Sequence, residues 1–377
     1  MEPGPTCEEG PQTAMRLSRA LTNAVRLRGA YRRLPSVNPA LPARADIEPT
    51  SYCNFRCRHC PSTSVAPAGS RTHLSLADFL HIVDQLPAIY RLKLVGLGEP
   101  LLNPEFFEMV RAARGRGIRV ITTTNGSLLD GERRGELLGC GLSVLNVSVD
   151  AANPETHARV RPGSDLEQIG EGVAALVRER GRRKAPRIRV WHVTQREAVA
   201  ELPDLVSLCA SWGVDALLCT AKITNFGSSS LEGIVRERRA LAADLQRAAP
   251  EARRRAAQAN LRFTCPEAPP RPRSVSEGAP CRWPWGRTFI TARGEVIPCP
   301  YASGPDGVVL GCLLASCHPE RSEGSVSVGQ ELGSCHPFAE IWNGPAMRQL
   351  REQVRDRRNP AFCRACYGGW EGPPAAC

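Results

Sequence analysis

The sequence contains almost no lysine and no long apolar run. Only Lys93, Lys184 and Lys222 are lysines among its 49 basic residues, so arginine carries nearly all of the net charge of +11. Such a skew is typical of genome composition, so the positive charge is weak evidence for a polyanionic partner. We therefore expect no nucleic-acid partner. No apolar stretch reaches the roughly 20 residues of a membrane span, and the N-terminus lacks the apolar middle of a signal peptide. These absences argue against a transmembrane segment and predict a cytoplasmic protein.

The 16 cysteines have no secretory signal beside them, which argues against a disulfide framework. In a reducing compartment, thiols at short spacing serve metal or redox chemistry instead. One group lies within Cys53–Cys60, and a second is spread over the C-terminal hundred residues. Three isolated cysteines lie on apolar periodic segments and are predicted to be core residues, namely Cys140, Cys209 and Cys219.

Residues 1–45 are predicted to form a basic N-terminal leader. The segment from Met15 to Ala45 carries seven arginines and no acid, and either Met1 or Met15 can be the true start. Two interpretations remain open: a solvated helix that packs on the body, which we favour, or a basic amphipathic helix for a membrane surface or an acidic partner. The apolar positions that fall near helical spacing are Leu17, Leu21, Ala24 and Val25.

Residues 46–227 alternate short β-like apolar runs with helical patterns. Ser75 and Asp78 form a capping box before one helix, and Asn103 is predicted as the N-cap of another. Six strand–helix units in succession predict a parallel sheet with right-handed crossovers. Since a closed TIM barrel needs eight, we expect an α/β fold with a partial (β/α)6 TIM-like barrel. The six runs lie near Ile47, Leu92, Ile118, Leu142, Arg187 and Asp215.

Beyond the barrel, the pattern predicts a helical segment and a Pro/Arg-rich linker over 228–280, then a small α+β cysteine-rich module over 281–377. Within that module, Gly294 is the turn residue of a predicted hairpin. The tetrapeptide SCHP occurs twice around a polar stretch without periodicity, so we expect an inserted surface loop at 312–335. A minor alternative is that its thiols and imidazoles bind metal, at Cys312, Cys317, His318, Cys335 and His336.

The densest cysteine group raises the question of which metal it holds. Cys53, Cys57 and Cys60 offer three thiols directly after the first predicted strand. Three cysteines suit a [4Fe–4S] cluster, since each takes one iron corner and the fourth iron stays open for substrate. The alternative is zinc with His59 as the fourth ligand, which we disfavour because that ring is wedged between two of the cysteines.

The spacing Cys53-x-x-x-Cys57-x-x-Cys60 after a strand resembles the signature of radical S-adenosylmethionine (SAM) enzymes. His59 fills the place where family members usually carry an aromatic ring. "GLGEP" from Gly96 resembles the GGEP motif, with Leu97 replacing the first of its adjacent glycines. The resemblance implies that a cluster-bound SAM is cleaved to methionine and a 5′-deoxyadenosyl radical. The SAM contacts it implies are Gly96, Gly98, Glu99, Pro100, Thr124, Asn125, Ser148, Asp150 and Arg161.

The C-terminal cysteines resemble the SPASM or twitch module that follows many radical SAM barrels. A full SPASM module has more cysteines after its CxxC pair, whereas here only Cys377 follows. The resemblance therefore implies one fully ligated auxiliary [4Fe–4S] cluster. The alternative is a four-cysteine zinc ribbon, which uses the same hairpin and CxxC arrangement. The four ligands implied are Cys281, Cys299, Cys363 and Cys366.

A fully ligated auxiliary cluster has no open iron for substrate, so its simplest role is to accept an electron. We therefore expect a radical SAM oxidoreductase that completes a two-electron oxidation and takes electrons from a ferredoxin- or flavodoxin-like donor. The substrate is predicted to be a small molecule, with a peptide- or protein-modifying maturase as one alternative and a basic zinc-binding scaffold as another. The general base cannot be identified from sequence.

Overall fold

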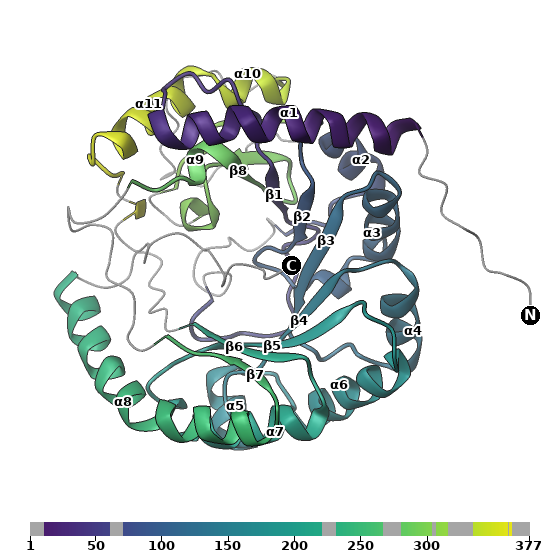
Figure 1. Cartoon of the computed structure of the whole chain (residues 1–377), viewed down its shortest axis with the longest axis vertical. Coiled ribbons are helices and arrows are strands. Elements are labelled where there is room, and N and C mark those ends of the chain that lie inside the picture. Colours follow the sequence, from purple (N-terminus) through teal and green to yellow (C-terminus); the bar gives the residue numbers. More distant parts are fainter. Residues whose placement is uncertain are drawn as a thin grey trace, which may run out of the picture.

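One ten-stranded sheet organises the protein. The computed structural model describes residues 11–60, 71–220, 231–266, 280–303, 307–315, 335–360 and 362–363. The strand order is β10-β9-β8-β1-β2-β3-β4-β5-β6-β7, and the strands from β8 through β7 are mutually parallel. Seen along its axis, the sheet curves into an open barrel with helices on its outer side (Figure 1).

All six predicted barrel strands are present, and the structure adds a seventh. The seventh, β7 (Arg262–Thr264), lies in the segment expected to be only helix and linker, and it pairs in parallel with β6. Its three residues are too short to show a period in the sequence. The predicted six are β1 (Arg44–Ile47), β2 (Arg91–Leu94), β3 (Arg119–Thr124), β4 (Val144–Ser148), β5 (Arg187–Val193) and β6 (Ala216–Thr220).

Helices cover the outer face of these strands because their apolar stripes must be buried. In α2, the Ser75 side chain accepts a hydrogen bond from the Asp78 amide, which confirms the predicted cap. The predicted N-cap Asn103 was wrong, because α3 begins at Phe106 with Glu105 as its N-cap. Asn103 still accepts from Glu105 N at 2.8 Å, and its amide donates to Pro49 O and Leu74 O. The helices are α2 (Leu76–Asp84), α3 (Phe106–Gly115), α4 (Gly131–Gly139), α5 (Pro154–Val160), α6 (Leu166–Arg180), α7 (Leu202–Trp212) and α8 (Leu231–Gln258).

The C-terminal part extends the barrel sheet instead of forming a separate one. The predicted hairpin is confirmed, with Gly294 at φ 83° between β8 and β9, a conformation that favours glycine. β8 pairs in parallel with β1, which the sequence did not predict. The division of the chain at 227/228 and 280/281 stays a prediction. The elements are α9 (Trp283–Gly286), β8 (Arg287–Ile290), β9 (Glu295–Ile297), β10 (Gly311–Cys312), α10 (Phe338–Trp342) and α11 (Pro345–Arg355), with most of the 312–335 loop outside the described residues.

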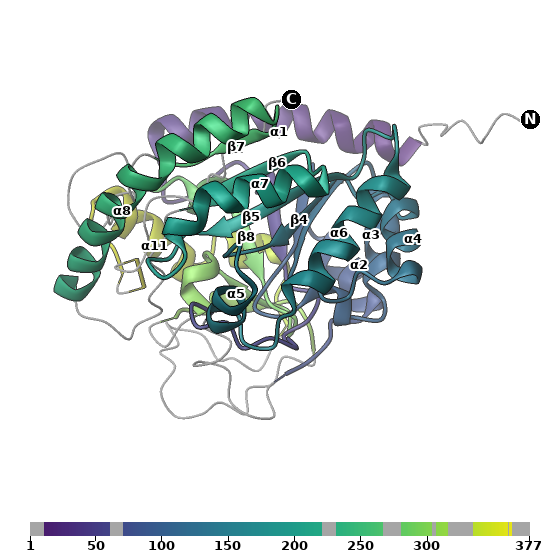
Figure 2. The same ribbon diagram turned by 90° about the horizontal axis from the view of Figure 1, so that it is seen from below.

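The N-terminal helix α1 (Pro11–Arg33) lies against the body beside α9 and the barrel's amino end (Figures 1 and 2). Asn23 fastens it through hydrogen bonds with both backbone groups of Leu41. Leu21 and Val25 face solvent with 71% and 76% of their surface exposed, so they do not form the packing stripe. Within the described part of the chain, no helix is both long and apolar enough to cross a bilayer.

Candidate active site

A cavity of about 260 Å³ lies at the carboxyl ends of the parallel strands. This is the end where α/β barrels place their binding sites, because the loops after successive strands converge there. The wall is built by both the barrel and the C-terminal part. Of the predicted site residues, the cavity is lined by Cys53, Cys57, Cys60, Gly96, Gly98, Glu99, Thr124, Asn125, Ser148 and Arg161.

The three N-terminal cysteines all line this cavity, and their role as cluster ligands stays a prediction. Their loop follows β1 and is fastened to the far side of the site, since Arg56 N donates to Pro162 O and Arg58 N donates to Val160 O. Burial raises the pKa of the Cys57 thiol to about 11, although the Arg161 guanidinium acts in the opposite direction. Burial also raises the pKa of Cys53. Unligated Cys53 and Cys57 are therefore protonated, so binding of iron to them must release protons.

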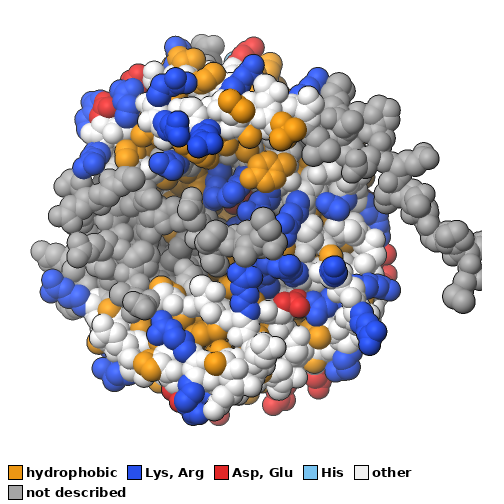
Figure 3. All heavy atoms as spheres, viewed as in Figure 1, with side chains coloured by type: hydrophobic (Ala, Val, Ile, Leu, Met, Phe, Trp, Pro, Cys, Tyr) orange, Lys and Arg blue, Asp and Glu red, His pale blue; other side chains and the backbone are white. Residues whose placement is uncertain are grey.

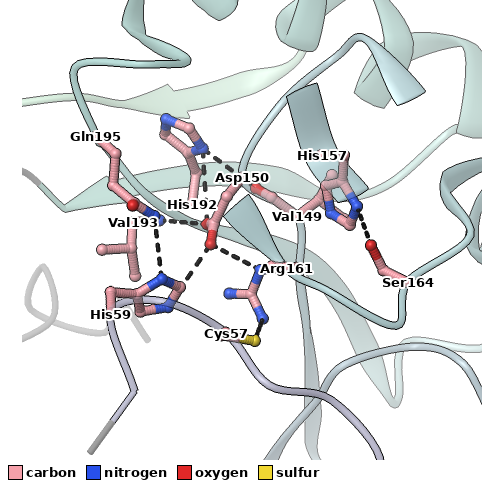
Figure 4. A network of polar contacts seen from close by, with 10 residues as sticks. All are labelled: Cys57, His59, Val149, Asp150, His157, Arg161, Ser164, His192, Val193 and Gln195. Carbon is pink, nitrogen blue, oxygen red and sulfur yellow. Dashed lines mark hydrogen bonds and ion pairs between the residues drawn. The ribbon is translucent and has the colours of Figure 1, made fainter. Parts of the chain in front are cut away.

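Both ring nitrogens of His59 lie near other protein groups, which speaks against the zinc alternative. Its Nδ1 lies 3.0 Å from Gln195 Nε2, and its Nε2 lies 3.7 Å from Asp150 Oδ2 (Figure 4). Burial lowers the pKa of His59 to about 4, against the opposing effect of Asp150, so the ring is neutral at pH 7. Among the residues with described side chains, no three His, Cys, Asp or Glu groups are arranged to hold a single metal ion.

Two glycines let the loop after β2 pass close to the backbone of the cysteine loop. A Cβ on Gly98 would stand 2.2 Å from Thr50 O and 2.5 Å from Tyr52 O, which no side chain tolerates. A Cβ on Gly96 would likewise stand 2.3 Å from the Glu48 side chain. The carboxylate of Glu48 holds the loop in place by accepting from Leu97 N at 2.6 Å. Leu97, which replaces a glycine of the GGEP motif, therefore lies between the two positions where the structure leaves no room for a side chain, and both of these are still glycine.

Glu99 joins this loop to the end of β3. Its carboxylate accepts from Thr124 Oγ1 and from Asn125 N, each at 2.6 Å. Only 2% of Glu99 is exposed, and burial raises its pKa to about 7 despite these hydrogen bonds. Pro100, predicted beside it, begins a short 3-10 turn (Pro100–Leu102), and the structure does not place it on the cavity wall.

Asp150 lies behind the cavity instead of lining it. It is fully buried and accepts from Arg161 Nε at 2.6 Å and from Val193 N at 2.8 Å (Figure 4). Burial alone would raise its pKa, but the Arg161 guanidinium, with smaller effects from the two imidazoles once they are protonated and from the Val193 amide, outweighs burial and lowers the pKa to about 2. The ionised Asp150 thereby orients Arg161, whose Nη1 lies 3.6 Å from Cys57 Sγ.

Sequence reasoning missed several residues that shape this site. The loop after β2 is held by Glu48 through Leu97 N, and His59 is contacted by Gln195. Asp150 lies next to His192, and the cavity wall includes Tyr301 from the C-terminal part. Their position in the sequence could have indicated them. Every second residue of a barrel strand points inward, and those at or just after the carboxyl end of the strand face the site. Trp191, on β5, also lines the cavity.

The predicted auxiliary ligands are partly described. Cys281, Cys299 and Cys363 are half-buried and form no disulfide, and Cys366 lies outside the described residues. Cys281 precedes α9, Cys299 follows β9, and Cys363 follows α11, which packs on α9. These elements lie side by side at one end of the sheet (Figure 1). Their role as a shared ligand set stays a prediction.

Together, fold and site define an α/β-barrel protein with the thiol set of an iron–sulfur enzyme. A family model of the radical SAM superfamily matches residues 47–194, and a model of the SPASM iron–sulfur cluster-binding domain matches residues 281–367. The chain belongs to the radical SAM superfamily and carries a SPASM domain C-terminal to its radical SAM domain. The first domain implies SAM and a [4Fe–4S] cluster, and the second implies auxiliary iron–sulfur ligation.

Similar proteins cover only part of this chain in sequence. The AdoMet-dependent heme synthase of Methanosarcina barkeri is 39% identical over 34% of this chain and 37% of its own length. The tungsten-containing aldehyde ferredoxin oxidoreductase cofactor-modifying protein of Pyrococcus furiosus is 33% identical over 46% of this chain and 49% of its own. The matches thus span half or less of these relatives.

Structural similarity extends further. Streptococcus suis SuiB, in its crystal structure bound to precursor peptide SuiA, superposes with a TM-score of 0.60 at 15% identity. The match covers 93% of this chain and 76% of that one. At this identity the likeness establishes the fold, including a barrel followed by a C-terminal module.

Proposed function

We propose that this protein is a radical SAM oxidoreductase that completes a two-electron oxidation. Cys53, Cys57 and Cys60 hold the SAM-binding [4Fe–4S] cluster. When bound, cluster and SAM supply a 5′-deoxyadenosyl radical that takes a hydrogen atom from the substrate. The C-terminal cysteines hold an auxiliary cluster as electron acceptor, and a ferredoxin- or flavodoxin-like protein is the external donor.

The observation that carries this proposal is the shared cavity wall. Cys53, Cys57 and Cys60 line the cavity together with Phe289 and Tyr301 of the C-terminal part. Tyr301 follows Cys299 by two residues, so a substrate held in the cavity lies next to the segment that carries a predicted auxiliary ligand. Short separation between substrate and acceptor is what an oxidation of this type requires.

The residues present fit SAM and its cluster. Three cysteines line one cavity, and the absent side chains of Gly96 and Gly98 let the loop after β2 pack against Glu48 and against the backbone of Thr50 and Tyr52 at the cavity wall. Arg161 brings a fixed guanidinium to the wall, held by Asp150, which suits the carboxylate of SAM. Phe55, Trp191 and other apolar side chains line the remainder and exclude water from a reactive intermediate.

Iron content and SAM cleavage test the first half of the proposal. Anaerobically reconstituted protein should carry about eight irons, two four-iron clusters, and release 5′-deoxyadenosine from SAM when reduced. Replacing Cys53, Cys57 and Cys60 with alanine should remove about four irons and all SAM cleavage. The matched control is Cys140→Ala with Cys209→Ala, two buried cysteines outside the site. Cleavage by the triple variant would contradict the site assignment.

A second variant tests the acceptor role. Cys281→Ala with Cys299→Ala should lose the other cluster yet still release 5′-deoxyadenosine, while oxidation of the substrate collapses. Lost ligation can also cost folding energy, so the variant must first be shown to be monodisperse. Normal oxidation without the auxiliary cluster would remove the acceptor role. A small molecule is proposed as the substrate, and deuterium transfer from labelled candidates into 5′-deoxyadenosine identifies it.

A further inference from the structure

Two cysteines that the proposed chemistry does not use lie side by side at the β7 edge of the sheet. Cys219 belongs to β6, and Cys265 directly follows β7. The two strands pair in parallel with Leu218 opposite Thr264, so one residue further along Cys219 stands opposite Cys265. Figure 1 shows β6 and β7 next to each other, with α7 and α8 on their outer side.

This placement suits a disulfide bond. Neighbouring strands lie about 4.8 Å apart, and disulfides join residues whose Cα atoms are about 4.4–6.8 Å apart. Residues that stand opposite each other in a parallel pair project from the same face of the sheet. The two side chains do meet, since the Cys219 thiol donates a hydrogen bond to the Cys265 sulfur. Both residues are present as free cysteines.

The two thiols differ in their access to solvent. Thr220 lines the cavity inside the barrel, so alternation turns Cys219 to the outer face, where α7 packs on β6. Only 9% of Cys219 is exposed, whereas Cys265 is half-buried just beyond the end of its strand. A reagent from solution therefore reaches Cys265 first.

The same surroundings separate the acidity of the two thiols. Burial raises the pKa of Cys219 well above its ordinary value, and its hydrogen bond to Cys265 raises it further. That hydrogen bond lowers the pKa of Cys265, and the charge of Arg253 on α8 also lowers it, against the opposing effect of burial. Arg253 Nη2 lies 3.5 Å from Cys265 O, to which it donates. While protonated, the Cys265 thiol donates to Pro266 O at 3.6 Å.

An accessible thiolate beside a buried thiol is the arrangement of a nucleophile with a resolving partner. The thiolate is the form that attacks a disulfide, so Cys265 starts the exchange. The buried Cys219 has only one sulfur within reach, that of Cys265, once a mixed disulfide has formed there. Intramolecular attack is then favoured because strand register already holds the two side chains together.

The charge of the protein favours an anionic oxidant. The chain carries a net charge of +11, and Figure 3 shows many more Lys and Arg than Asp and Glu side chains on one face of the molecule. A field of this sign attracts small anions from solution. Glutathione disulfide, which is anionic at pH 7, is a common small disulfide that exchanges with protein thiols.

We propose that Cys219 and Cys265 form a reversible dithiol–disulfide pair that reacts with a low-molecular-weight disulfide. The Cys265 thiolate attacks one sulfur of that disulfide and expels the other as a thiolate, which leaves a mixed disulfide on Cys265. Cys219 then loses its proton to water, attacks the Cys265 sulfur and expels the second small thiolate. Two electrons pass from the protein pair to the small disulfide, and one S–S bond replaces another. The proposed substrate oxidation does not depend on this pair.

The test treats the anaerobic holoenzyme with glutathione disulfide, alkylates the remaining thiols and maps tryptic peptides by mass spectrometry. The peptide that holds Cys219 should become joined to the peptide that holds Cys265, and dithiothreitol should separate them. Cys209 lies on the same tryptic peptide as Cys219, so fragment spectra must assign the link. The matched control Cys140→Ser removes a buried cysteine elsewhere and should form the link within about twofold of the unchanged protein.

Single substitutions separate the roles of the two thiols. Cys219→Ser leaves the nucleophile without its resolving partner, so one glutathione should accumulate on Cys265. Cys265→Ser should leave Cys219 unmodified, because that thiol is buried and protonated. Thermal unfolding confirms that the variants are folded. Absence of the link in the unchanged protein, a link from Cys265 to Cys209, or glutathione on Cys219 in the Cys265→Ser variant would each overturn the assignment.

Discussion

The two ends of the barrel are built from the same strands yet have opposite chemistry. At the carboxyl end, buried acids such as Glu48, Glu99 and Asp150 hold loops and a guanidinium in place through direct hydrogen bonds. At the amino end, arginines of neighbouring strands stand in register. The difference teaches that inward positions along one strand serve two purposes: at the carboxyl end buried acids are paired with donors, whereas at the amino end strand register brings like charges next to one another.

The largest expected effect on stability comes from breaking the buried ion pair between Asp150 and Arg161 at the carboxyl end of the barrel. Asp150→Asn leaves Arg161 buried without its carboxylate, which should lower the free energy of unfolding by about 3–5 kcal/mol. The control Asp84→Asn breaks an exposed pair with Arg116 and should cost less than about 1 kcal/mol. Urea unfolding measures both. Equal costs would show that the internal pairing is not what distinguishes this end.

Glu48 provides a pH test. Burial raises its pKa to about 7, so the folded protein binds more protons than the unfolded chain between the ordinary value of 4.5 and 7. Stability from this group is therefore present at low pH and is lost as pH rises through that window. Glu48→Gln cannot ionise, so the stability difference between wild type and variant should shift by about 3 kcal/mol from acid to pH 8. Glu108→Gln, which removes a carboxylate from an exposed helix position, is the matched control.

Two glycine substitutions compare a crowded position at the site with an uncrowded position in a helix, and they change side-chain size instead of charge. Gly98→Ala forces a Cβ against two backbone oxygens, so it should cost about 1–3 kcal/mol and weaken SAM binding. Gly135→Ala, inside α4 with nothing within 4 Å of the new Cβ, should stabilise the protein by about 0.5–1 kcal/mol. Thermal unfolding and SAM titration read out the two effects. Unchanged SAM binding in Gly98→Ala would show that the loop does not need close approach.

The smallest expected effect lies at the amino end. Arg119→Gln relieves repulsion with Arg91 and should raise the free energy of unfolding by about 0.5 kcal/mol at low ionic strength. The gain should shrink as salt is added, because screening already weakens the repulsion. Unfolding at two salt concentrations checks this. A loss of stability on substitution would mean that Arg119 has a stabilising partner and that the two ends do not differ as described.

Much of the barrel and of the site could be predicted from sequence. Alternating β runs and helices predicted six strands, and the cysteine triplet predicted the thiols that now line one cavity. The seventh strand and the pairing of β8 with β1 were not predictable, because three or four residues carry no periodic signal and their partners lie far away in the chain. Pro100 and Asp150 were predicted as ligand contacts, yet neither lies on the cavity wall.

By itself, the sequence determined the chemistry of local spacing: three thiols within eight residues, a glycine-containing loop after the second strand, and six alternating strand–helix units. These follow from covalent neighbours and from the alternation of side chains along a strand. Only the tertiary structure decided which of these groups meet. Asp150 and Arg161, eleven positions apart, form a buried pair, and Arg44, Arg91 and Arg119 form one charged row. Register between strands fixes such meetings, and register depends on packing across the whole barrel.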